Sequence, residues 1–392
     1  MVTNAAIEGH DVWVVDPSLF TLPYDHELCQ SLASQGHRVR LITRTLRQLE
    51  ATLTPPRYDF SGLFYHLSEG RVLARSGRWI PRIVKGCEHV VGMMRLARML
   101  RASTPDIVHF QWLPLPWVDR PALAAMARRC SLVLTVHDAT AQGGRGFARL
   151  QRSGFFSTLK YFSRLVVHNE TGRQALVESG VDAATIEILP HPPLPLPDGR
   201  AQPDLSSPVL MIFGEIKPYK GIDLAIEALA HLPDTHKKNV RLVIAGKAQM
   251  PLDGLKALAH DLGVTADIEW IDRYIPLRDL RTVLGSAAVF LLPYREADAS
   301  GVFAQVLQLG RPIIASRTGV FSQFVGESGC GVLVEPGNST ELAEAIVRIL
   351  DSPDHAARMG ANARRLSRSM GSWHDMAVGL TDIYNRVRAE RR

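Results

Sequence analysis

The sequence predicts an α/β protein built from two doubly wound parallel sheets. Short, β-branched apolar runs alternate with helical patterns along the chain, which is typical of parallel strands buried on both faces. These runs form two series, and a chain of 392 residues favours two domains. A proline-rich stretch separates the two series. We therefore expect an N-terminal domain at 1–190, a linker at 191–207 and a C-terminal domain at 208–371.

The predicted strands follow from these runs. The first series comprises Val12–Val15, Val39–Thr43, Ile107–Phe110, Leu132–Val136, Leu165–His168 and Glu187–Leu189. The second comprises Val209–Phe213, Arg241–Ala245, Ile268–Ile271, Val289–Leu292, Ile313–Ser316 and Gly331–Val334. Between them, seven of the 19 residues from Pro190 to Pro208 are proline, which lacks the amide hydrogen that a sheet interior requires. A final helix over 372–388 carries one apolar stripe.

Composition limits the class of protein. The chain is 46% hydrophobic and 21% charged, as globular proteins are, and it holds no apolar run of the roughly 20 residues that cross a bilayer. No signal peptide is evident, and four scattered cysteines fit a reducing cytoplasm. The net charge of +6 lies in the first half, where residues 1–190 hold 22 Lys/Arg against 16 Asp/Glu. That excess favours an anionic partner.

The loop Gly214–Gly221, G-E-I-K-P-Y-K-G, follows a predicted strand and precedes a helix. A strand, a glycine loop and a helix start offer backbone amides to a phosphate, and Lys217 and Lys220 add positive charge. Spacing alone also allows these lysines to be merely solvated.

A second helix start lies at Ser300-Gly301, after the strand Val289–Leu292. Ser300 suits an N-cap and Gly301 allows close approach to the backbone. Ligands of open α/β sheets bind at this carboxyl edge, so the two loops together are expected to hold a diphosphate without a metal. An ordinary capped helix is the alternative.

Two polar groups in the first half also follow strands. His137-Asp138 ends a strand and faces the carboxyl edge of the first sheet, although a lone histidine there is often structural. Tyr24-Asp25-His26 opens a helix after the first strand and is expected to contact an acceptor, unless Asp25 only caps the helix.

The segment Arg71–Arg101 combines eight Lys/Arg and one acid, Glu88, with apolar residues. Such a segment either lies on an anionic membrane surface or forms a solvated basic face over a core stripe. Nucleic acid is not expected as a partner, because the aromatic interleaving of single-strand binders is missing.

Several motifs, in order, resemble glycosyltransferase family 4, whose members are retaining enzymes of the GT-B fold. The likeness runs from about Val12 to Val387. It rests on G-H-R-V at 36–39, P-D-I-V-H at 105–109, T-V-H-D at 135–138, L-P-H-P at 189–192, the loop at 214–221, I-A-G at 244–246, L-L-P-Y at 291–294, S-G-V at 300–302 and G-R-P-I-I-A-S at 310–316.

The resemblance implies two Rossmann-like domains with a deep cleft between them, and roles for matched positions. His137 corresponds to a catalytic-site histidine that contacts the donor sugar, and the last helix to one that packs on the first domain. The implied donor-binding residues are Gly214, Lys217, Lys220, Gly246, Arg273, Tyr274, Ile275, Ser300, Gly301, Val302 and Gln305.

The chain departs from the family pattern in its charges. The loop arginine is Glu215, and the paired glutamates, eight residues apart, fall at Ala297 and Gln305. Glu296 or Asp298 is the candidate replacement for the first glutamate, and both are predicted as catalytic. Gln305 retains hydrogen-bonding ability toward a ribose.

The expected activity is retaining transfer of a hexosyl unit from a nucleotide-diphosphate sugar to a glycan or lipid-linked acceptor, in surface polysaccharide or glycolipid synthesis. No cofactor or metal is expected. The expected location is the cytoplasm, peripheral to the inner face of the membrane. Two alternatives stay open: an inverting GT-B transferase or sugar-nucleotide epimerase, and a non-catalytic protein that binds a nucleotide sugar or a partner.

Overall fold

A computed structural model describes residues 9–46, 56–68, 80–137, 154–196, 207–296 and 300–391. The chain divides into two compact units. The N-terminal unit comprises Met1–Pro192 and Ser372–Arg392, and the C-terminal unit comprises Pro193–Gly371. Of the expected linker, residues 197–206 lie outside the described residues.

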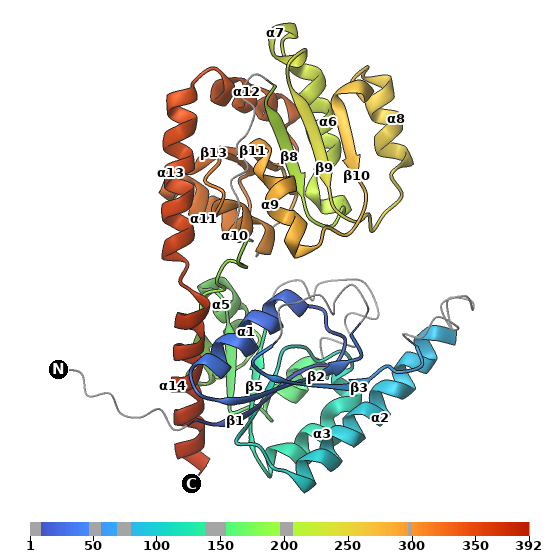
Figure 1. The fold of residues 1–392 in the computed structure, drawn as a ribbon, viewed down its shortest axis with the longest axis vertical. Helices are drawn as coiled ribbons and strands as arrows, with labels where there is room; N and C mark the ends of the chain where they lie inside the picture. Colours follow the sequence, from blue (N-terminus) through green and yellow to red (C-terminus); the bar gives the residue numbers. More distant parts are fainter. Residues whose placement is uncertain are drawn as a thin grey trace, which may run out of the picture. The chain divides into compact units, whose positions relative to one another are not determined.

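The N-terminal unit contains a seven-stranded parallel sheet in the order β3-β2-β1-β4-β5-β6-β7 (Figure 1). Its strands are β1 (Asp11–Asp16), β2 (Arg38–Arg44), β3 (Asp59–Phe64), β4 (Ile107–Phe110), β5 (Ser131–Thr135), β6 (Arg164–Val167) and β7 (Ile186–Ile188). Its helices are α1 (Leu22–Ser34), α2 (Ile80–Ala102), α3 (Pro116–Ala127), α5 (Glu170–Glu178), the 3₁₀ turn η4 (Ala183–Thr185) and α14 (Trp373–Arg391).

Alternate residues of the central strands pack on opposite faces of this sheet. Trp13 and Val15 join one apolar core with residues of α2, α3 and α5. Helices α1 and α14 lie side by side, as Figure 1 shows, and bury Leu28 and Leu380. The apolar stripe expected in the last helix is confirmed, because Trp373, Met376, Ala377, Leu380, Ile383, Tyr384 and Val387 are all buried.

The C-terminal unit repeats the pattern with a six-stranded parallel sheet, in the order β10-β9-β8-β11-β12-β13. Its strands are β8 (Val209–Phe213), β9 (Arg241–Ala245), β10 (Ile268–Ile271), β11 (Ala287–Leu292), β12 (Ile313–Ser316) and β13 (Gly331–Val334). Its helices are η5 (Pro218–Lys220), α6 (Ile222–His231), α7 (Asp234–Lys237), α8 (Asp253–Asp261), η6 (Thr265–Asp267), α9 (Leu277–Gly285), α10 (Gly301–Leu307), α11 (Gly319–Ser328), α12 (Ser339–Leu350) and α13 (Pro353–Ser369).

Two separate cores cover the faces of this second sheet. Leu210 and Ile212 face the core shared with α6, α8 and α12, whereas Val209 and Met211 face the core shared with α9, α10 and α11. The doubly wound α/β prediction is confirmed. The sequence reading missed one strand, β3, whose D-F-S-G-L-F lacks a continuous apolar run.

No helix in the described ranges is both long enough and apolar enough to span a bilayer.

Candidate functional site

Three glycines bring backbone segments together at the carboxyl edge of the second sheet. Gly214 follows β8 with φ +98°, and a Cβ there would lie 2.6 Å from Lys220 Nζ and 2.8 Å from Val302 Cγ2. Gly246 follows β9 with φ +149°, and its Cβ would lie 2.2 Å from the Gly214 carbonyl oxygen. Gly221 has φ +64° and abuts the Pro293 carbonyl. A side chain at any of these positions would collide with its neighbours, so the chain keeps glycine here.

Lys220 is folded into this edge. Its side chain is buried, and Nζ donates a 2.9 Å hydrogen bond to the Phe213 carbonyl oxygen and lies 5.4 Å from the centre of the Tyr294 ring. Burial, together with the nearby charge of Lys217, lowers the pKa of Lys220 to about 8, while Glu215 opposes the shift. The ammonium is therefore poorly compensated and is placed to take an anionic partner.

Glu215, the acid that replaces the family's arginine, is held by other groups. Its carboxylate lies 2.8 Å from Lys217 Nζ and accepts a hydrogen bond from Gln249 Nε2. The pair is partly exposed, so its contribution to stability is small. Lys217 is thereby engaged with Glu215, which leaves Lys220 as the more deeply placed cation.

Sequence reasoning missed Arg295, which ties the loop after β11 to the turn that carries Lys220. Its guanidinium bonds both carboxylate oxygens of Asp223, at 3.0 and 2.5 Å, and donates to the Pro218 carbonyl oxygen. Its backbone amide donates to the Tyr219 carbonyl oxygen. No motif spacing links residues 72 positions apart, so only the folded chain reveals this clamp.

The start of α10 has the cap that the sequence predicts. Ser300 Oγ accepts a 3.1 Å hydrogen bond from the amide of Phe303, and the next turn brings Val302 against Gly214. Gln305 is buried, and within the described residues its amide nitrogen has no hydrogen-bond partner. Glu296 is exposed at the end of the preceding loop, whereas Asp298 lies outside the described residues.

The loop after β10 presents one aromatic ring. Tyr274 is 59% exposed, while the next residue, Ile275, is buried in the core beside α9. Arg273 Nη1 lies 3.8 Å from the carboxylate oxygen Oδ2 of Asp279. Of the three residues expected near the nucleotide base, Tyr274 offers the accessible flat surface.

In the N-terminal unit, His137 follows β5 and lies within a group of rings. Its Nε2 lies 3.0 Å from Gln111 Oε1 and its Nδ1 lies 3.3 Å from His168 Nε2. Trp112 stacks on its ring at 5.1 Å between centroids. Burial, and then the charges of neighbouring histidines, lowers the pKa of His137 well below its usual value. The ring is therefore neutral near pH 7, and Gln111, His168 and Trp112 hold it in place.

Tyr24, Asp25 and His26, the predicted acceptor residues, are all buried in α1. The Tyr24 ring contacts that of His137 at 4.8 Å, and His26 Nδ1 lies 2.9 Å from the Tyr58 hydroxyl. Of the three side chains, Tyr24 packs on His137, and all three are covered in the structure.

Asp25 instead pairs with Asp16 beneath the loop that follows β1. Asp16 accepts hydrogen bonds from the backbone amides of Ser18, Leu19 and Thr21. Burial raises the pKa of both carboxyl groups, and that of Asp25 is raised further by the charge of Asp16. Two adjacent buried carboxyls are stable when they share a proton. The two carboxyl groups hold the D-P-S-L-F-T loop at 16–21 through hydrogen bonds from Ser18, Leu19 and Thr21.

Within the part of the chain that the structure describes, no cluster of three or more His, Cys, Asp or Glu is arranged to hold a metal ion.

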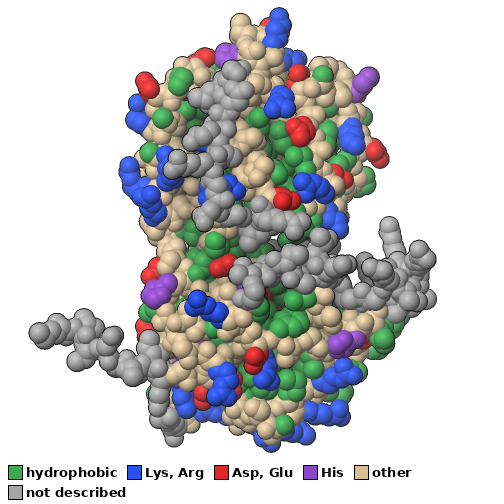
Figure 2. Space-filling model, in the orientation of Figure 1, with side chains coloured by type: hydrophobic (Ala, Val, Ile, Leu, Met, Phe, Trp, Pro, Cys, Tyr) green, Lys and Arg blue, Asp and Glu red, His purple; other side chains and the backbone are tan. Residues whose placement is uncertain are grey.

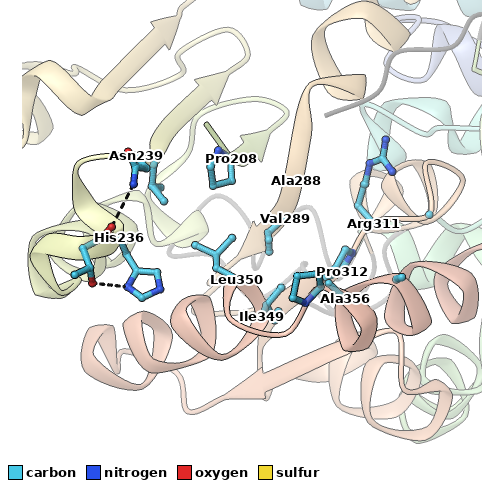
Figure 3. Close-up of a pocket in the computed structure, with 15 residues that line it drawn as sticks. Pro208, His236, Asn239, Ala288, Val289, Arg311, Pro312, Ile349, Leu350 and Ala356 are labelled. Atoms are coloured by element: carbon cyan, nitrogen blue, oxygen red, sulfur yellow. Dashed lines mark hydrogen bonds between the residues drawn. The ribbon is translucent and has the colours of Figure 1, made fainter. Parts of the chain in front are cut away.

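An apolar cavity lies at a different place in the C-terminal unit. Its volume is about 420 Å³. Figure 3 shows Pro208, Val289, Pro312, Ile349 and Leu350, which are among the residues that line it. Pro208 and Pro312 directly precede β8 and β12, so the cavity lies at the amino edge of the second sheet, opposite to Gly214. None of the predicted site residues lines it.

Comparisons with known proteins agree with the fold. Residues 24–192 match the model described as Glycosyltransferase Family 4, and residues 200–366 match Glycosyl transferases group 1. A D-inositol 3-phosphate glycosyltransferase of Xylanimonas cellulosilytica is 26% identical, over 94% of this chain and 92% of that protein. An MMP alpha-(1->4)-mannosyltransferase of Mycolicibacterium hassiacum is 31% identical over 43% of this chain and 41% of that protein.

Solved structures show the same architecture. HepE of Anabaena, in complex with UDP and glucose, superimposes with a TM-score of 0.73 at 14% identity, over 96% of this chain and 100% of that one. WaaG, a glycosyltransferase involved in lipopolysaccharide biosynthesis, superimposes with a TM-score of 0.69 at 16% identity. The match covers 95% of this chain and 99% of WaaG. The fold is therefore that of the GT-B glycosyltransferases. The two family models together span most of the sequence, and the chain belongs to glycosyltransferase family 4.

Proposed function

We propose that this glycosyltransferase moves a hexosyl unit from a nucleotide-diphosphate sugar, with retention of the anomeric configuration, to a glycan or lipid-linked acceptor. The observation that carries the proposal is the meeting of Lys220, Gly214 and Val302 at one sheet edge. A buried cation beside bare backbone suits a diphosphate, because charge-assisted bonds to phosphate are strong where water is excluded.

Each donor group has a proposed role. Lys220 binds the diphosphate and stabilises the negative charge that grows on it as the glycosidic bond breaks. The amides of Ser300, Gly301 and Val302 bind the distal phosphate, and Tyr274 stacks on the base. The solved structures of HepE contain UDP or UDP-glucose, which supports a nucleotide donor of this kind.

The catalytic carboxylate and the acceptor are proposed from the same framework. Glu296 or Asp298 takes the position of the first family glutamate, and Gln305 bonds the ribose. His137 contacts the donor sugar. Because full-length relatives are named D-inositol 3-phosphate glycosyltransferases, inositol phosphates belong among the acceptors tested beside glycans and lipid-linked sugars.

Helix α2 supports a peripheral membrane position. Ile83, Val91 and Met94 are exposed to 66%, 45% and 52%, and they recur at helical spacing with the exposed Arg95 and Arg98. Near α2, the face drawn in Figure 2 shows apolar side chains beside Lys and Arg. We propose that this stripe contacts anionic lipid. Flotation of the protein with phosphatidylglycerol vesicles tests this contact. We expect the wild-type protein to float in a salt-sensitive manner and the double variant Ile83→Glu/Met94→Glu not to float. Absence of flotation of the wild-type protein would refute the proposal.

The function is tested by incubating the purified chain with UDP-, GDP- and ADP-sugars and the acceptor panel, and measuring released diphosphate. We expect acceptor-dependent release with one donor, unchanged by a chelator, and a product whose anomeric configuration matches the donor by NMR. An inverted product would favour the inverting alternative. Release that required a divalent metal would refute the metal-independent mechanism.

A further inference from the structure

A chain of hydrogen bonds runs along the carboxyl edge of the first sheet from Leu189 to Gln111. His168 Nδ1 lies 2.9 Å from the Leu189 carbonyl oxygen, and His168 Nε2 lies 3.3 Å from His137 Nδ1. His137 Nε2 lies 3.0 Å from Gln111 Oε1. The carbonyl oxygen at the first end can only accept, so His168 Nδ1 carries a hydrogen.

That fixed end determines the direction of every other bond. A neutral His168 has a lone pair on Nε2, so His137 must donate from Nδ1 and keep its own lone pair on Nε2. This lone pair requires a donor, yet Gln111 Oε1 faces it. Among the described residues, the buried Gln111 Nε2 has no hydrogen-bond partner. A half-turn of the Gln111 amide satisfies both groups at once.

The opposite direction requires a charged His168, which would donate from both nitrogens and leave His137 to donate from Nε2. The surroundings disfavour that charge. Burial, and then the charge of His191, lowers the pKa of His168 to about 3, although the Leu189 carbonyl opposes the shift. The titratable rings that contact His168 are those of Tyr24, His137 and His191, and none supplies a negative charge at neutral pH.

We propose that His168 is a positioning residue that fixes His137 as the tautomer with its hydrogen on Nδ1. The Nε2 of His137 then accepts a hydrogen bond, from Gln111 in the free enzyme and from a ligand hydroxyl that displaces the Gln111 amide. The site thereby selects a hydroxyl donor, such as a hydroxyl group of the transferred sugar, over a carboxylate or phosphate. This step rests on the proposed function, in which His137 contacts the donor sugar.

Nitrogen NMR of the full-length, histidine-labelled protein tests the tautomer directly. Long-range proton–nitrogen correlations at pH 7 distinguish protonated from bare ring nitrogens, and single substitutions at His137 and His168 assign the signals. We expect both rings to be neutral with hydrogen on Nδ1. Hydrogen on Nε2 of His137 would overturn the proposal. The readout needs no turnover, so a correct tautomer without transfer would refute the proposed function alone.

Two substitutions separate positioning from packing. His168→Gln retains an amide oxygen near His137 Nδ1, whereas His168→Asn retains the bond to Leu189 and loses that to His137. We expect the Asn variant to lose the Nδ1 tautomer and to raise KM for the donor about tenfold, the value of one hydrogen bond. The Gln variant should stay within about threefold. Equal losses in both variants with the His137 tautomer unchanged would contradict the proposal.

Discussion

The two units have the same order of central strands but different interiors. Among the described residues, the N-terminal unit buries sixteen polar or charged side chains, whereas the C-terminal unit buries four. In the first unit the carboxyl edge is built from side chains, with His137, His168 and Tyr24 in mutual contact. In the second it is built from bare backbone at Gly214 and Gly246 around Lys220.

This difference shows that one sheet topology can carry a carboxyl edge built from side chains or one built from backbone. Side-chain networks are sensitive to protonation and to the loss of a single partner, because a buried polar group left unpaired costs about 1–3 kcal/mol. Backbone sites tolerate changes of side chain nearby but do not tolerate an added Cβ.

Gly246→Ala should damage the C-terminal unit most. The new Cβ would lie 2.2 Å from the Gly214 carbonyl oxygen at a φ of +149°, so we expect a loss of about 3 kcal/mol or more in unfolding free energy. Gly254→Ala in α8 is the matched control, since nothing lies within 4 Å of its Cβ. The protection of backbone amides in β8 and β9 against hydrogen exchange measures the stability of both variants. Equal protection in the two variants would refute the account.

Mild acid should loosen the N-terminal unit first. Burial lowers the pKa of His109 and His168 to about 3 and that of His37 to about 4. The unfolded chain then binds more protons than the folded one below about pH 6.5, so stability falls as pH drops toward 4. Asp16 and Asp25, whose pKa values are raised, oppose this trend.

The histidines outnumber this acid pair, and each unit of pKa shift is worth about 1.4 kcal/mol. Hydrogen exchange by mass spectrometry at pH 7 and pH 5, corrected for intrinsic rates, should show loss of protection in β4, β5 and β6 but not in β8, β9 and β11. In the second unit His231, His236, His260 and His355 are at least partly exposed. An equal loss of protection in the sheets of both units would contradict the proposed difference between the units.

The smallest effect is a decline of kcat/KM at alkaline pH. Lys220 has a pKa of about 8 in the free enzyme, so its charge, and with it donor capture, is lost as pH rises through 8. We expect about a tenfold fall per pH unit above that value. Lys220→Arg keeps its charge and should abolish the decline, whatever its absolute rate. A decline that persists in the arginine variant would have another origin.

The sequence predicts more of the geometry of the C-terminal sheet edge than of the N-terminal one. Gly214, Lys217 and Lys220 lie in one loop, so local motif and spacing carry the signal. The ring cluster around His137 joins Trp112, His168, His191 and Trp373, which come from separate segments and meet only in the folded chain. The burial of Asp25 beside Asp16 had no sequence signature either, because the two residues lie on different elements, β1 and α1.

The central claim is that Lys220, rather than Lys217, binds the donor diphosphate. Calorimetric titration of UDP, or of the diphosphate identified by the donor panel, into wild type, Lys220→Met and Lys217→Met tests it. Because bonds to charged groups are worth about 1.5–3 kcal/mol, we expect Lys220→Met to weaken binding by roughly 10- to 100-fold and Lys217→Met by less than about threefold. Equal affinity in wild type and Lys220→Met would contradict the claim.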